Sequence, residues 1–482
     1  MCGLRIFRKD GKTLNDTFYI QQMGVIMRLA AIVLIILPIL AKGQETIPSD
    51  QTKMSSLPAS SFLKGIRVGW NVGNSLEAMN GSVPDETAWG NPKITQQLID
   101  SVKAAGFNAI RLPIAWSVFS DAANYTIKKE WLDRVQEVVN YAIDRDMYVV
   151  MNEHWDGGWL QPTNAAKETA TKRLTAIWKQ VAIRFRDYGD HLLFAGTNEV
   201  MKEGDYGTPT TELITVQSGY NQSFVNTVRA TGGRNAYRYL VVQAFNTNID
   251  HAVSFFKLPS DEPQDRLVME VHYYDPYEFT IASDKTDITQ WGAGGSSSKK
   301  ATWDSDESHV DAQFAKIKAN FINKGIPVIL GEYAAMLKNT SDNPPFRLAW
   351  DKYVTQAAIK VGMIPFYWDP GSLSTNSSGL FDRNTGKQGY PDVIKAIVSA
   401  APPTRVQPHA GERRSAVLHW LARSGDLLCS AGAAEIFLYH LDGSLVRRSI
   451  IKQGRAVCSL RGLQGGAYVA RSGVNAISIM VQ

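Results

Sequence analysis

Leu192-Leu-Phe-Ala-Gly-Thr-Asn-Glu-Val200 and Pro327-Val-Ile-Leu-Gly-Glu-Tyr333 are two short apolar runs, and each leads into a glutamate, Glu199 in the first and Glu332 in the second. Runs of this kind are typical of strands that are buried on both faces, as in a parallel sheet. A parallel barrel carries its chemistry at the carboxyl ends of its strands, so both glutamates are candidate catalytic residues. Paired carboxyl groups at such a place favour glycoside hydrolysis, in which one donates a proton and the other attacks the sugar or activates water.

Short apolar runs alternate with amphipathic stretches from Gly65 to Ala401, which predicts repeated strand–helix units and a closed (β/α)8 TIM barrel, an α/β fold. Eight strands are expected, at Gly65–Gly73, Asn108–Ile114, Met147–His154, His191–Glu199, Tyr239–Asn246, Arg266–Tyr274, Pro327–Tyr333 and Met363–Trp368. Seven helices are expected, at Asn91–Gly106, Lys129–Arg145, Lys167–Tyr188, Thr211–Thr231, His309–Lys324, Phe346–Val361 and Tyr390–Ala400. The chain is long for the bare fold, so surplus residues are expected in loops, of which Gly292–Ser308 is the clearest.

The composition is that of a globular protein with one large and one small domain: 482 residues, 44% apolar and 20% charged. The net charge of +5 is unevenly placed, because residues 404–482 hold 10 Lys and Arg against 4 Asp and Glu, and the rest of the chain holds 41 against 42. A nearly neutral large domain has no electrostatic footprint for nucleic acid. Its aromatic residues suit an uncharged sugar polymer, whose ring faces pack on aromatic side chains.

The N-terminal segment has the pattern of a secretory signal. Met27 opens a basic start, an apolar stretch of 12 residues runs from Leu29 to Leu40, and the small residues Ala41 and Gly43 follow. The stretch is too short for a comfortable membrane span, so we expect cleavage near Gly43 and no stable membrane span after processing. The alternative is an N-terminal membrane anchor.

A compositional change after Pro402-Pro403 marks a second domain. Short alternating or apolar runs with Gly and Asp turns predict a small antiparallel β sandwich, with strands at Ala416–Trp420, Glu435–Tyr439, Ala456–Leu460 and Ala476–Val481. The expected divisions are a signal peptide with an upstream extension (1–43), a linker (44–59), the catalytic barrel (60–401), a second linker (402–411) and the sandwich (412–482). Cys429 and Cys458 in the sandwich could pair in an oxidising compartment.

Polar residues follow seven of the eight expected strands, and they should meet in one pocket of a closed barrel. Arg111 and Tyr274 can hold a carboxylate in its ionised state. Asn198 offers an amide to a sugar hydroxyl, and Trp368 can floor a sugar subsite. The complete set is Asn71, Arg111, His154, Asn198, Glu199, His272, Tyr274, Glu332 and Trp368. No group of His and Cys residues in the sequence has metal-ligand spacing, so no metal or cofactor is expected.

Several segments resemble glycoside hydrolase family 5, in particular its bacterial endo-β-1,4-glucanases. The resemblance covers about residues 60–400 and rests on Gly69-Trp-Asn-Val-Gly-Asn-Ser-Leu-Glu-Ala78, Glu86-Thr-Ala-Trp-Gly-Asn-Pro92, Gly106-Phe-Asn-Ala-Ile-Arg-Leu-Pro113, Asn198-Glu199, Val271-His-Tyr-Tyr274, Gly331-Glu-Tyr333 and Trp368-Asp-Pro-Gly371. It implies a retaining double displacement with Glu199 as acid/base and Glu332 as nucleophile. The family's active-site Arg, Asn, His, His, Tyr and Trp fall on Arg111, Asn198, His154, His272, Tyr274 and Trp368.

Two departures from the family pattern concern the substrate preference more than the chemistry. Val200 stands where the family commonly has Pro, and Trp155 stands where it often has a second His. We expect the two carboxyl groups about 5–5.5 Å apart, as retention requires, and a pKa of Glu199 that the ionised Glu332 helps to raise. Asp156 and Asp275 are the alternative carboxylates. The aromatic side chains that could either line the cleft or pack in the core are Trp116, Trp159, Trp291 and Tyr277.

The C-terminal segments Ala433-Ala-Glu-Ile-Phe-Leu-Tyr-His-Leu-Asp-Gly-Ser-Leu-Val446 and Leu463-Gln-Gly-Gly-Ala-Tyr-Val-Ala-Arg-Ser-Gly473 resemble the sorting domain of the bacterial type IX secretion system. This resemblance implies export across the outer membrane, with the outer-membrane secretion machinery as a partner. The alternative is a small carbohydrate-binding sandwich, although its aromatic residues mostly fall at alternating positions suited to a core, as Trp420, Phe437, Tyr439 and Tyr468 do.

The sequence therefore predicts a secreted or cell-surface bacterial endo-β-1,4-glucanase that acts on β-glucan polysaccharide and binds no nucleic acid. Xyloglucanase, mixed-linkage glucanase and β-mannanase are close alternatives, because glucan and mannan backbones differ in the orientation of one hydroxyl group that no motif specifies. A catalytically silent glycan-binding surface protein is the alternative of another class.

Overall fold

The structure is a computed structural model that describes residues 47–401 and, in the C-terminal part, residues 417–421, 426–430, 435–440, 445–450, 455–459, 462–472 and 475–481. The expected signal peptide and the second linker lie outside the described residues. Part of the expected first linker lies against the barrel, because the Asp50 N–H donates to Gly233 O (3.1 Å) and the Ser55 N–H donates to Asp190 Oδ2 (3.0 Å). Within the described ranges, no helix is both long and apolar enough to span a membrane.

Eight parallel strands close into a barrel in the order β1-β12-β11-β10-β9-β8-β7-β4, and β4 pairs with β1. They are β1 (Gly69–Val72), β4 (Ala109–Leu112), β7 (Tyr148–Asn152), β8 (Leu192–Ala195), β9 (Leu240–Gln243), β10 (Leu267–His272), β11 (Val328–Tyr333) and β12 (Ile364–Asp369). Seven lie within one predicted range each, and β12 extends one residue beyond its range, to Asp369, so the predicted (β/α)8 barrel is confirmed. Nearly every strand residue is buried, which explains why the strands read as continuous apolar runs.

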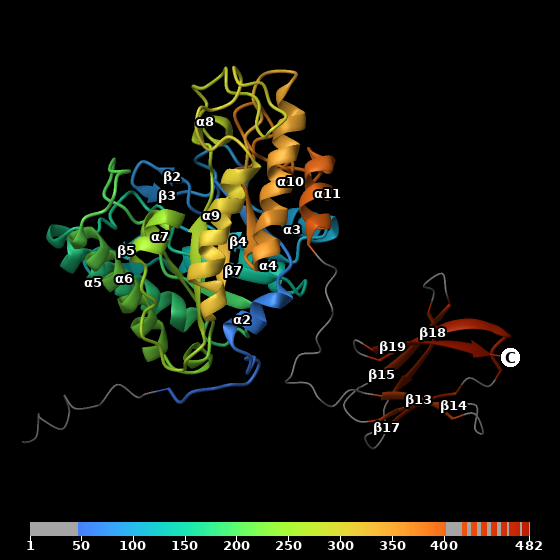
Figure 1. Ribbon diagram of the computed structural model, residues 1–482. Helices are drawn as coiled ribbons and strands as arrows, with labels where there is room; N and C mark the ends of the chain where they lie inside the picture. Colours follow the sequence, from blue (N-terminus) through green and yellow to red (C-terminus); the bar gives the residue numbers. More distant parts are fainter. Residues whose placement is uncertain are drawn as a thin grey trace, which may run out of the picture. The chain divides into compact units, whose positions relative to one another are not determined.

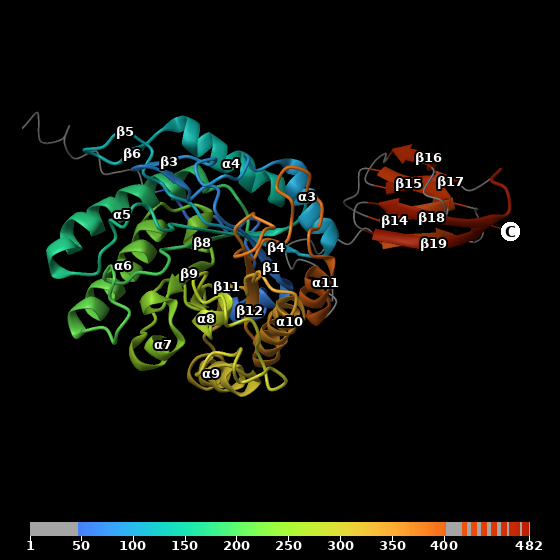
Figure 2. The ribbon, with the colours of Figure 1, turned by 90° about the horizontal axis from the view of Figure 1, so that it is seen from above.

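A ring of helices surrounds the barrel, as Figure 2 shows from above. One main helix follows each strand: α3 (Gln96–Ala105), α4 (Lys129–Ile143), α5 (Asn164–Arg184), α6 (Thr211–Ala230), α7 (Ile249–Phe255), α9 (Glu307–Asn320), α10 (Asn343–Val361) and α11 (Pro391–Ala400). Only α7 falls outside the predicted helices, because seven residues are too few to display the helical period of apolar positions.

Short helices and hairpins lie at both ends of the barrel. The loops after the strands carry the hairpin of β2 (Met79–Asn80) with β3 (Val83–Pro84), the hairpin of β5 (Phe119–Asp121) with β6 (Thr126–Ile127), and the short helix α8 (Tyr277–Thr280). No helix or strand occurs between α8 and α9, which agrees with the long loop expected there. Helix α2 (Ala59–Phe62) lies at the opposite end, before β1 (Figure 1).

The lower interior of the barrel is apolar. Ala109, Val150, Leu193, Val241, Val268, Ile329 and Phe366 point inward from seven strands and pack with Phe62 and Leu63 into one core cluster. Strand β1 contributes Gly69, where a Cβ atom would lie 1.9 Å from the Phe366 ring. Phe62 stacks on Tyr239 with the ring centroids 4.0 Å apart. This apolar plug closes one end of the barrel, so polar chemistry is confined to the other end.

The described C-terminal residues form two antiparallel sheets, β13-β14-β17 and β16-β15-β18-β19, as the predicted small all-β region requires. Their strands are β13 (Val417–Leu421), β14 (Asp426–Ser430), β15 (Glu435–His440), β16 (Leu445–Ile450), β17 (Arg455–Ser459), β18 (Gly466–Ser472) and β19 (Asn475–Val481). Leu438 and Tyr468 are buried, whereas Phe437 and Tyr439 are half-buried. The predicted pairing of Cys429 with Cys458 falls on side chains outside the described ones.

Candidate active site

The site is built from the inward-facing positions directly above the apolar plug. Inward-facing side chains occur at every second position of a strand. In six of the strands, the residue two positions after the one at the level of the plug is polar or aromatic, and its side chain faces the space above the plug. These residues are Asn71, Arg111, Asn152, Gln243, Glu270 and Trp368. Loops that follow the strands add Glu199, His154 and Tyr274.

Several predicted strands extend too far, and three of them include site residues that lie in loops: Glu199, His154 and Tyr274 lie beyond β8, β7 and β10. Backbone pairing of this segment with β9 ends at Gly196, whose N–H donates to Val241 O (3.0 Å), because the next N–H, of Thr197, donates to the side-chain Oε1 of Gln243 (3.0 Å) instead of to a backbone carbonyl. The three residues still lie at the carboxyl end of the barrel, so the placement of the site is unaffected.

Glu332, on β11, is held by a cation and a hydroxyl. Arg111 Nη1 lies 2.8 Å from Glu332 Oε1, and the Tyr274 hydroxyl donates to Glu332 Oε2 at 3.0 Å. Glu332 is 5% exposed. Burial raises the pKa of its carboxyl above the ordinary value, and the positive charges of His272 and Arg111 oppose that rise. Burial and the charge of Glu332 raise the pKa of Tyr274 well above its usual value, so Tyr274 stays a neutral donor.

Glu199 lies on the loop between β8 and α6 and contacts a histidine. Its side chain is 41% exposed, and its Oε1 lies 2.6 Å from Nδ1 of His272. One carboxylate oxygen of Glu199 and one of Glu332 lie within 4.8 Å of each other. The two glutamates therefore face the same small space, although 133 residues separate them in the sequence.

His272 is the charged partner of both glutamates. Burial lowers the pKa of His272, but the charges of Glu332, Glu199 and Glu270 outweigh burial and raise it to about 9. Its Nδ1 lies 3.7 Å from Glu332 Oε2 as well. At neutral pH the imidazole is thus protonated, and its two N–H groups face carboxylates on both sides.

The protonated His272 reverses the expected order of the carboxyl pKa values. Burial alone would raise the pKa of Glu199, but the hydrogen bond and the charge of His272 outweigh it and lower that pKa. The expectation of a raised pKa for Glu199 in the free protein is therefore wrong. The reason is that the pairing of Glu199 with His272, from another strand, has no signal in the sequence.

The orientations of Asn152, His154 and Asn198 follow from their hydrogen bonds. The Ile114 N–H donates to Asn152 Oδ1 (3.2 Å), so Asn152 Nδ2 faces His154 Nδ1 at 3.0 Å. His154 Nδ1 must therefore accept. Burial and the charges of Arg111 and His272 lower the pKa of His154 well below its usual value, so the ring is neutral and its proton sits on Nε2.

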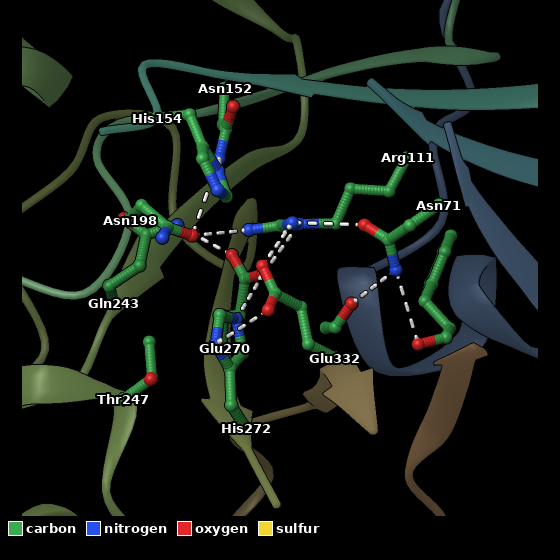
Figure 3. A network of polar contacts seen from close by, with 12 residues as sticks. Asn71, Arg111, Asn152, His154, Asn198, Gln243, Thr247, Glu270, His272 and Glu332 are labelled. Carbon is green, nitrogen blue, oxygen red and sulfur yellow. Dashed lines mark hydrogen bonds and ion pairs between the residues drawn. The ribbon is translucent and has the colours of Figure 1, made fainter. Parts of the chain in front are cut away.

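Asn198 presents its amide nitrogen rather than its oxygen. Its Oδ1 accepts from Arg111 Nη2 at 2.7 Å, which leaves Nδ2 as the free donor of this side chain (Figure 3). Asn71 is different. It is fully buried, accepts from Arg111 Nη1 (3.0 Å) and donates to Gly331 O (2.9 Å), so it orients Arg111 and is not positioned to bind a sugar.

Trp368 and His154 form one wall. Their rings are parallel within 8°, with centroids 5.7 Å apart. Gly73 makes room for this tryptophan, because a Cβ atom at that position would lie 2.9 Å from the Trp368 ring and 2.8 Å from Asp369 O. A half-exposed indole beside a neutral imidazole offers the flat apolar surface that a sugar ring requires.

The structure adds polar residues that the sequence patterns did not single out. Glu270 is fully buried beside Arg111, Gln243 donates to Glu270, and the Thr247 hydroxyl approaches Glu199 Oε1 at 3.5 Å. Glu270 has one usable signal, since it is the lone charge within the apolar run Leu267-Val-Met-Glu-Val271 and precedes His272 by two positions. Period-two spacing on a strand places both on the inner face.

The alternative carboxylates bind other protein groups, and two of the aromatic side chains pack in the core. Asp156 accepts from the Trp116 N–H (3.1 Å) and the Ser117 hydroxyl (2.5 Å), and Asp275 binds His309. Trp116 and Trp291 are buried and pack in the core, Trp159 is half-buried, and Tyr277 is exposed. Trp155, which follows His154, is also exposed.

Two side-chain groups in the described residues have a spacing that could hold a metal ion: Glu199 with His272 and Glu332, and Asp275 with Asp304 and His309. In the first group, the protonated His272 already supplies the positive charge. In the second, both ring nitrogens of His309 face carboxylates, at 3.2 Å and 2.8 Å. Ion pairing within the protein therefore accounts for both groups.

Comparisons with known proteins agree with this geometry. The family profile described as Cellulase (glycosyl hydrolase family 5) matches residues 69–374. The xyloglucan-specific endo-β-1,4-glucanase BoGH5A of Bacteroides ovatus is 44% identical over 372 residues, which are 73% of this chain and 72% of that protein. Endoglucanase A of Paenibacillus barcinonensis is 36% identical, over 77% of this chain and 97% of its own length.

Solved structures give the same result. The Bacteroides ovatus family 5 xyloglucanase in complex with a XXXG heptasaccharide has a TM-score of 0.71 and covers 74% of this chain and 79% of its own. A family 5 xyloglucanase from Paenibacillus pabuli has a TM-score of 0.68 at 38% identity, with coverage of 70% and 99%. The chain therefore belongs to glycosyl hydrolase family 5.

Proposed function

We propose that this protein is an endo-β-1,4-glucanase that cleaves internal β-1,4 linkages of β-glucans by a retaining double displacement. Glu332 is the nucleophile and Glu199 is the acid/base. The observation that carries the proposal is the approach of one oxygen of Glu199 to one of Glu332 within 4.8 Å. Retaining enzymes hold the two carboxyl groups about 5–5.5 Å apart, whereas inverting enzymes need about 6.5–9.5 Å to fit a water.

The nucleophile is prepared by its donors. Arg111 and Tyr274 each contact one oxygen of Glu332, which stabilises the carboxylate and aims it. When Glu332 attacks the anomeric carbon, its negative charge is lost in the ester. Donors that are fixed in place before the reaction need no reorganisation as this charge moves.

The acid/base obtains its proton from His272. In the free protein, the proton lies on the imidazole, 2.6 Å from Glu199 Oε1. A bound sugar removes water from the exposed face of Glu199, which raises the pKa of that carboxyl and draws the proton from Nδ1 to Oε1. Glu199 then gives it to the departing glycosidic oxygen. In the second step Glu199 takes a proton from water, whose oxygen displaces Glu332 and restores the configuration of the sugar.

The side chains around the two glutamates suit a sugar bound at the cleavage point. His154 presents Nε2–H, Asn198 presents Nδ2, and Trp368 presents an aromatic face. Among substrates, β-1,4-glucans with xyloglucan as one of them are favoured, because relatives named for xyloglucan are 44% and 38% identical to this chain. Mixed-linkage glucan and β-mannan remain the close alternatives.

Secretion and domain function are part of the proposal. Residues 1–43 serve as the removable signal, residues 60–401 form the catalytic domain, and residues 412–482 form a sorting domain recognised by outer-membrane secretion machinery of type IX. The predicted signal pattern and the C-terminal motifs support this division. Deleting residues 412–482 should retain the enzyme inside a bacterium that has this machinery, and undiminished export would contradict the assignment.

Activity on soluble polysaccharides tests the proposal. Wild type, Glu332→Gln and Glu199→Gln are assayed by reducing-end release on carboxymethylcellulose, xyloglucan, mixed-linkage glucan and glucomannan. We expect a rapid fall in viscosity with wild type and a loss of about a hundredfold or more in kcat for Glu199→Gln, as for other general acids. If Glu332→Gln releases reducing ends as fast as wild type, the enzyme assignment is wrong and a glycan-binding role takes its place.

A further inference from the structure

Glu270 is a charged residue in the middle of the barrel that does not reach the substrate space. It is fully buried on β10, and three side chains from three strands meet its carboxylate. Arg111 Nε lies 2.9 Å from Oε1, His272 Nε2 lies 3.3 Å from Oε1, and Gln243 Nε2 donates to Oε2 at 2.6 Å. The closed barrel therefore contains a buried carboxylate beside Arg111 and His272 (Figure 3).

The neighbouring strand leaves space for this carboxylate. A Cβ atom on Gly331, the residue before Glu332, would lie 1.9 Å from Glu270 Oε1. No flexible end could relieve such a contact, since Glu270 is fully buried and contacted on both oxygens. A glycine at position 331 thus lets β10 and β11 pack with a charged group between them.

We propose that Glu270 is a positioning residue for both catalytic carboxylates: it orients Arg111, which holds Glu332, and His272, which holds Glu199. The inference rests on the proposed function, because it concerns how the two glutamates are kept ready. Each of the two cations uses one of its nitrogens on Glu270 and another on a catalytic carboxylate. One buried carboxylate therefore fixes the two contacts on which the proposed mechanism depends.

Charge balance explains why a carboxylate is needed. The carboxylates that face His272 are Glu199, Glu270 and Glu332, and the charge of His272 also acts on His154. Arg111 and Tyr274 also contact Glu332. Arg111 lowers the pKa of Glu270 to about 2 despite its burial, so Glu270 is ionised at any working pH. With a neutral amide at position 270, His272 would keep only Glu199 and Glu332, whose charges change during the reaction. The imidazole would then lose its proton at lower pH.

A purely structural role for Glu270 makes a different prediction. Arg111 is buried and needs a counter-charge whatever the reaction is. Loss of the Glu270 carboxylate would therefore lower stability in any case. A structural role alone would leave the pH dependence of activity and the protonation of His272 unchanged.

The experiment compares Glu270→Gln and Glu270→Asp with wild type and with Asp190→Asn. Asp190 is a buried carboxylate that accepts from the Ser55 N–H, before β8 at the opposite end of the barrel, so it controls for general loss of stability. The kcat/KM and KM of each protein are measured on xyloglucan or carboxymethylcellulose from pH 5 to 10. The pKa of His272 is read separately from the imidazole signals in NMR spectra, assigned with His272→Gln.

For Glu270→Gln we expect the alkaline limb of kcat/KM and the NMR pKa of His272 to move together to lower pH by about one unit or more. We expect kcat to fall about tenfold or more and KM to stay within about twofold, as the lost contacts are charge-assisted and none involves substrate. The Asp variant keeps the charge but withdraws it, so it should shift less in the same direction. This variant carries the test if the Gln variant does not fold.

Unchanged alkaline limbs and an unchanged pKa of His272 in both Glu270 variants would overturn the inference, as would an equal shift in Asp190→Asn. Wild-type inactivity on every β-glucan would overturn the proposed function instead. The NMR titration would still report on Glu270 in that case, so the two failures are distinguishable.

Discussion

Arg111 shows how the chemistry of this site depends on individual side chains. Its guanidinium contacts Asn71, Asn198, Glu270 and Glu332, which come from four different segments of the chain. A planar group with five donors can satisfy several partners at fixed angles, which lysine could not do. One residue therefore aligns both the proposed nucleophile, Glu332, and the Asn198 amide proposed to bind the sugar.

Removal of the Tyr274 hydroxyl should impair Glu332, because the carboxylate loses one of the two donors that stabilise and aim it. The hydroxyl donates to Glu332 Oε2 at 3.0 Å, and a hydrogen bond to a charged group contributes about 1.5–3 kcal/mol. We expect Tyr274→Phe to lower kcat about ten- to a hundredfold with little change in KM, as measured by steady-state kinetics. Tyr277→Phe is the matched control, because that side chain is exposed, and a comparable loss there would contradict the explanation.

Activity should depend on pH through His272 and Glu332. The pKa of His272 is raised to about 9, so the proton that Glu199 needs is present at neutral pH and is lost as the pH rises through about 9. The raised pKa of Glu332 places the acid limb above the ordinary glutamate value, since a protonated carboxyl is no nucleophile. A kcat/KM profile without an alkaline limb near pH 9 would contradict the role of His272. His309→Asn, outside the site, should leave the profile unchanged.

Strands and loops differ in how much of their structure follows from local sequence. Buried strands have continuous apolar runs, so all eight barrel strands could be predicted. The predicted strands at β7, β8 and β10 extend into the loops that follow them, because the hydrogen bonds that end strand pairing, such as the one from the Thr197 N–H to Gln243 Oε1, have no local signal in the sequence. Helix α7 has only seven residues, too few to show the helical period of apolar positions. Glu270 and the protonated state of His272 could not be predicted, because they depend on contacts among β4, β9, β10 and β11, which only the closed barrel brings together.

The loop between β7 and α5 contains a carboxyl group that should destabilise the protein. Glu153 is fully buried and neither of its oxygens has a hydrogen-bond partner. Burial, with the charge of Asp156, raises its pKa well above the ordinary value, so stability is lost as the pH rises from the unfolded pKa of about 4.3 toward the folded one. We expect Glu153→Leu to raise the free energy of unfolding by about 1–3 kcal/mol at pH 8.

The measurement is thermal unfolding of Glu153→Leu and wild type at pH 5 and pH 8. The gain should be larger at pH 8, where the wild type must keep a proton on Glu153 or bury a charge. Glu86→Leu is the control and should lower stability, because Glu86 accepts from the Ile94 N–H (2.6 Å) and pairs with Arg134 (2.8 Å). A lower melting temperature of Glu153→Leu at both pH values would contradict the prediction.

For the whole protein, we expect catalysis to depend on the barrel alone. All nine predicted site residues lie between Asn71 and Trp368, and the two core clusters of the described residues extend no further than Ala401. We expect residues 47–401, expressed alone, to have the kcat/KM of the full chain on soluble β-glucans within about twofold. A loss of more than tenfold in a fragment with native circular dichroism would mean that the C-terminal domain takes part in catalysis.

Trapping of the covalent intermediate decides whether the two glutamates act as described. A 2-deoxy-2-fluoro-β-cellobioside with a good leaving group is incubated with the protein, and the labelled peptide is identified by mass spectrometry. We expect one label per protein, attached to Glu332, and no label on Glu332→Gln. A label on Glu199, Asp156 or Asp275, or release of the α-anomer as the first product without any covalent species, would contradict a double displacement through Glu332.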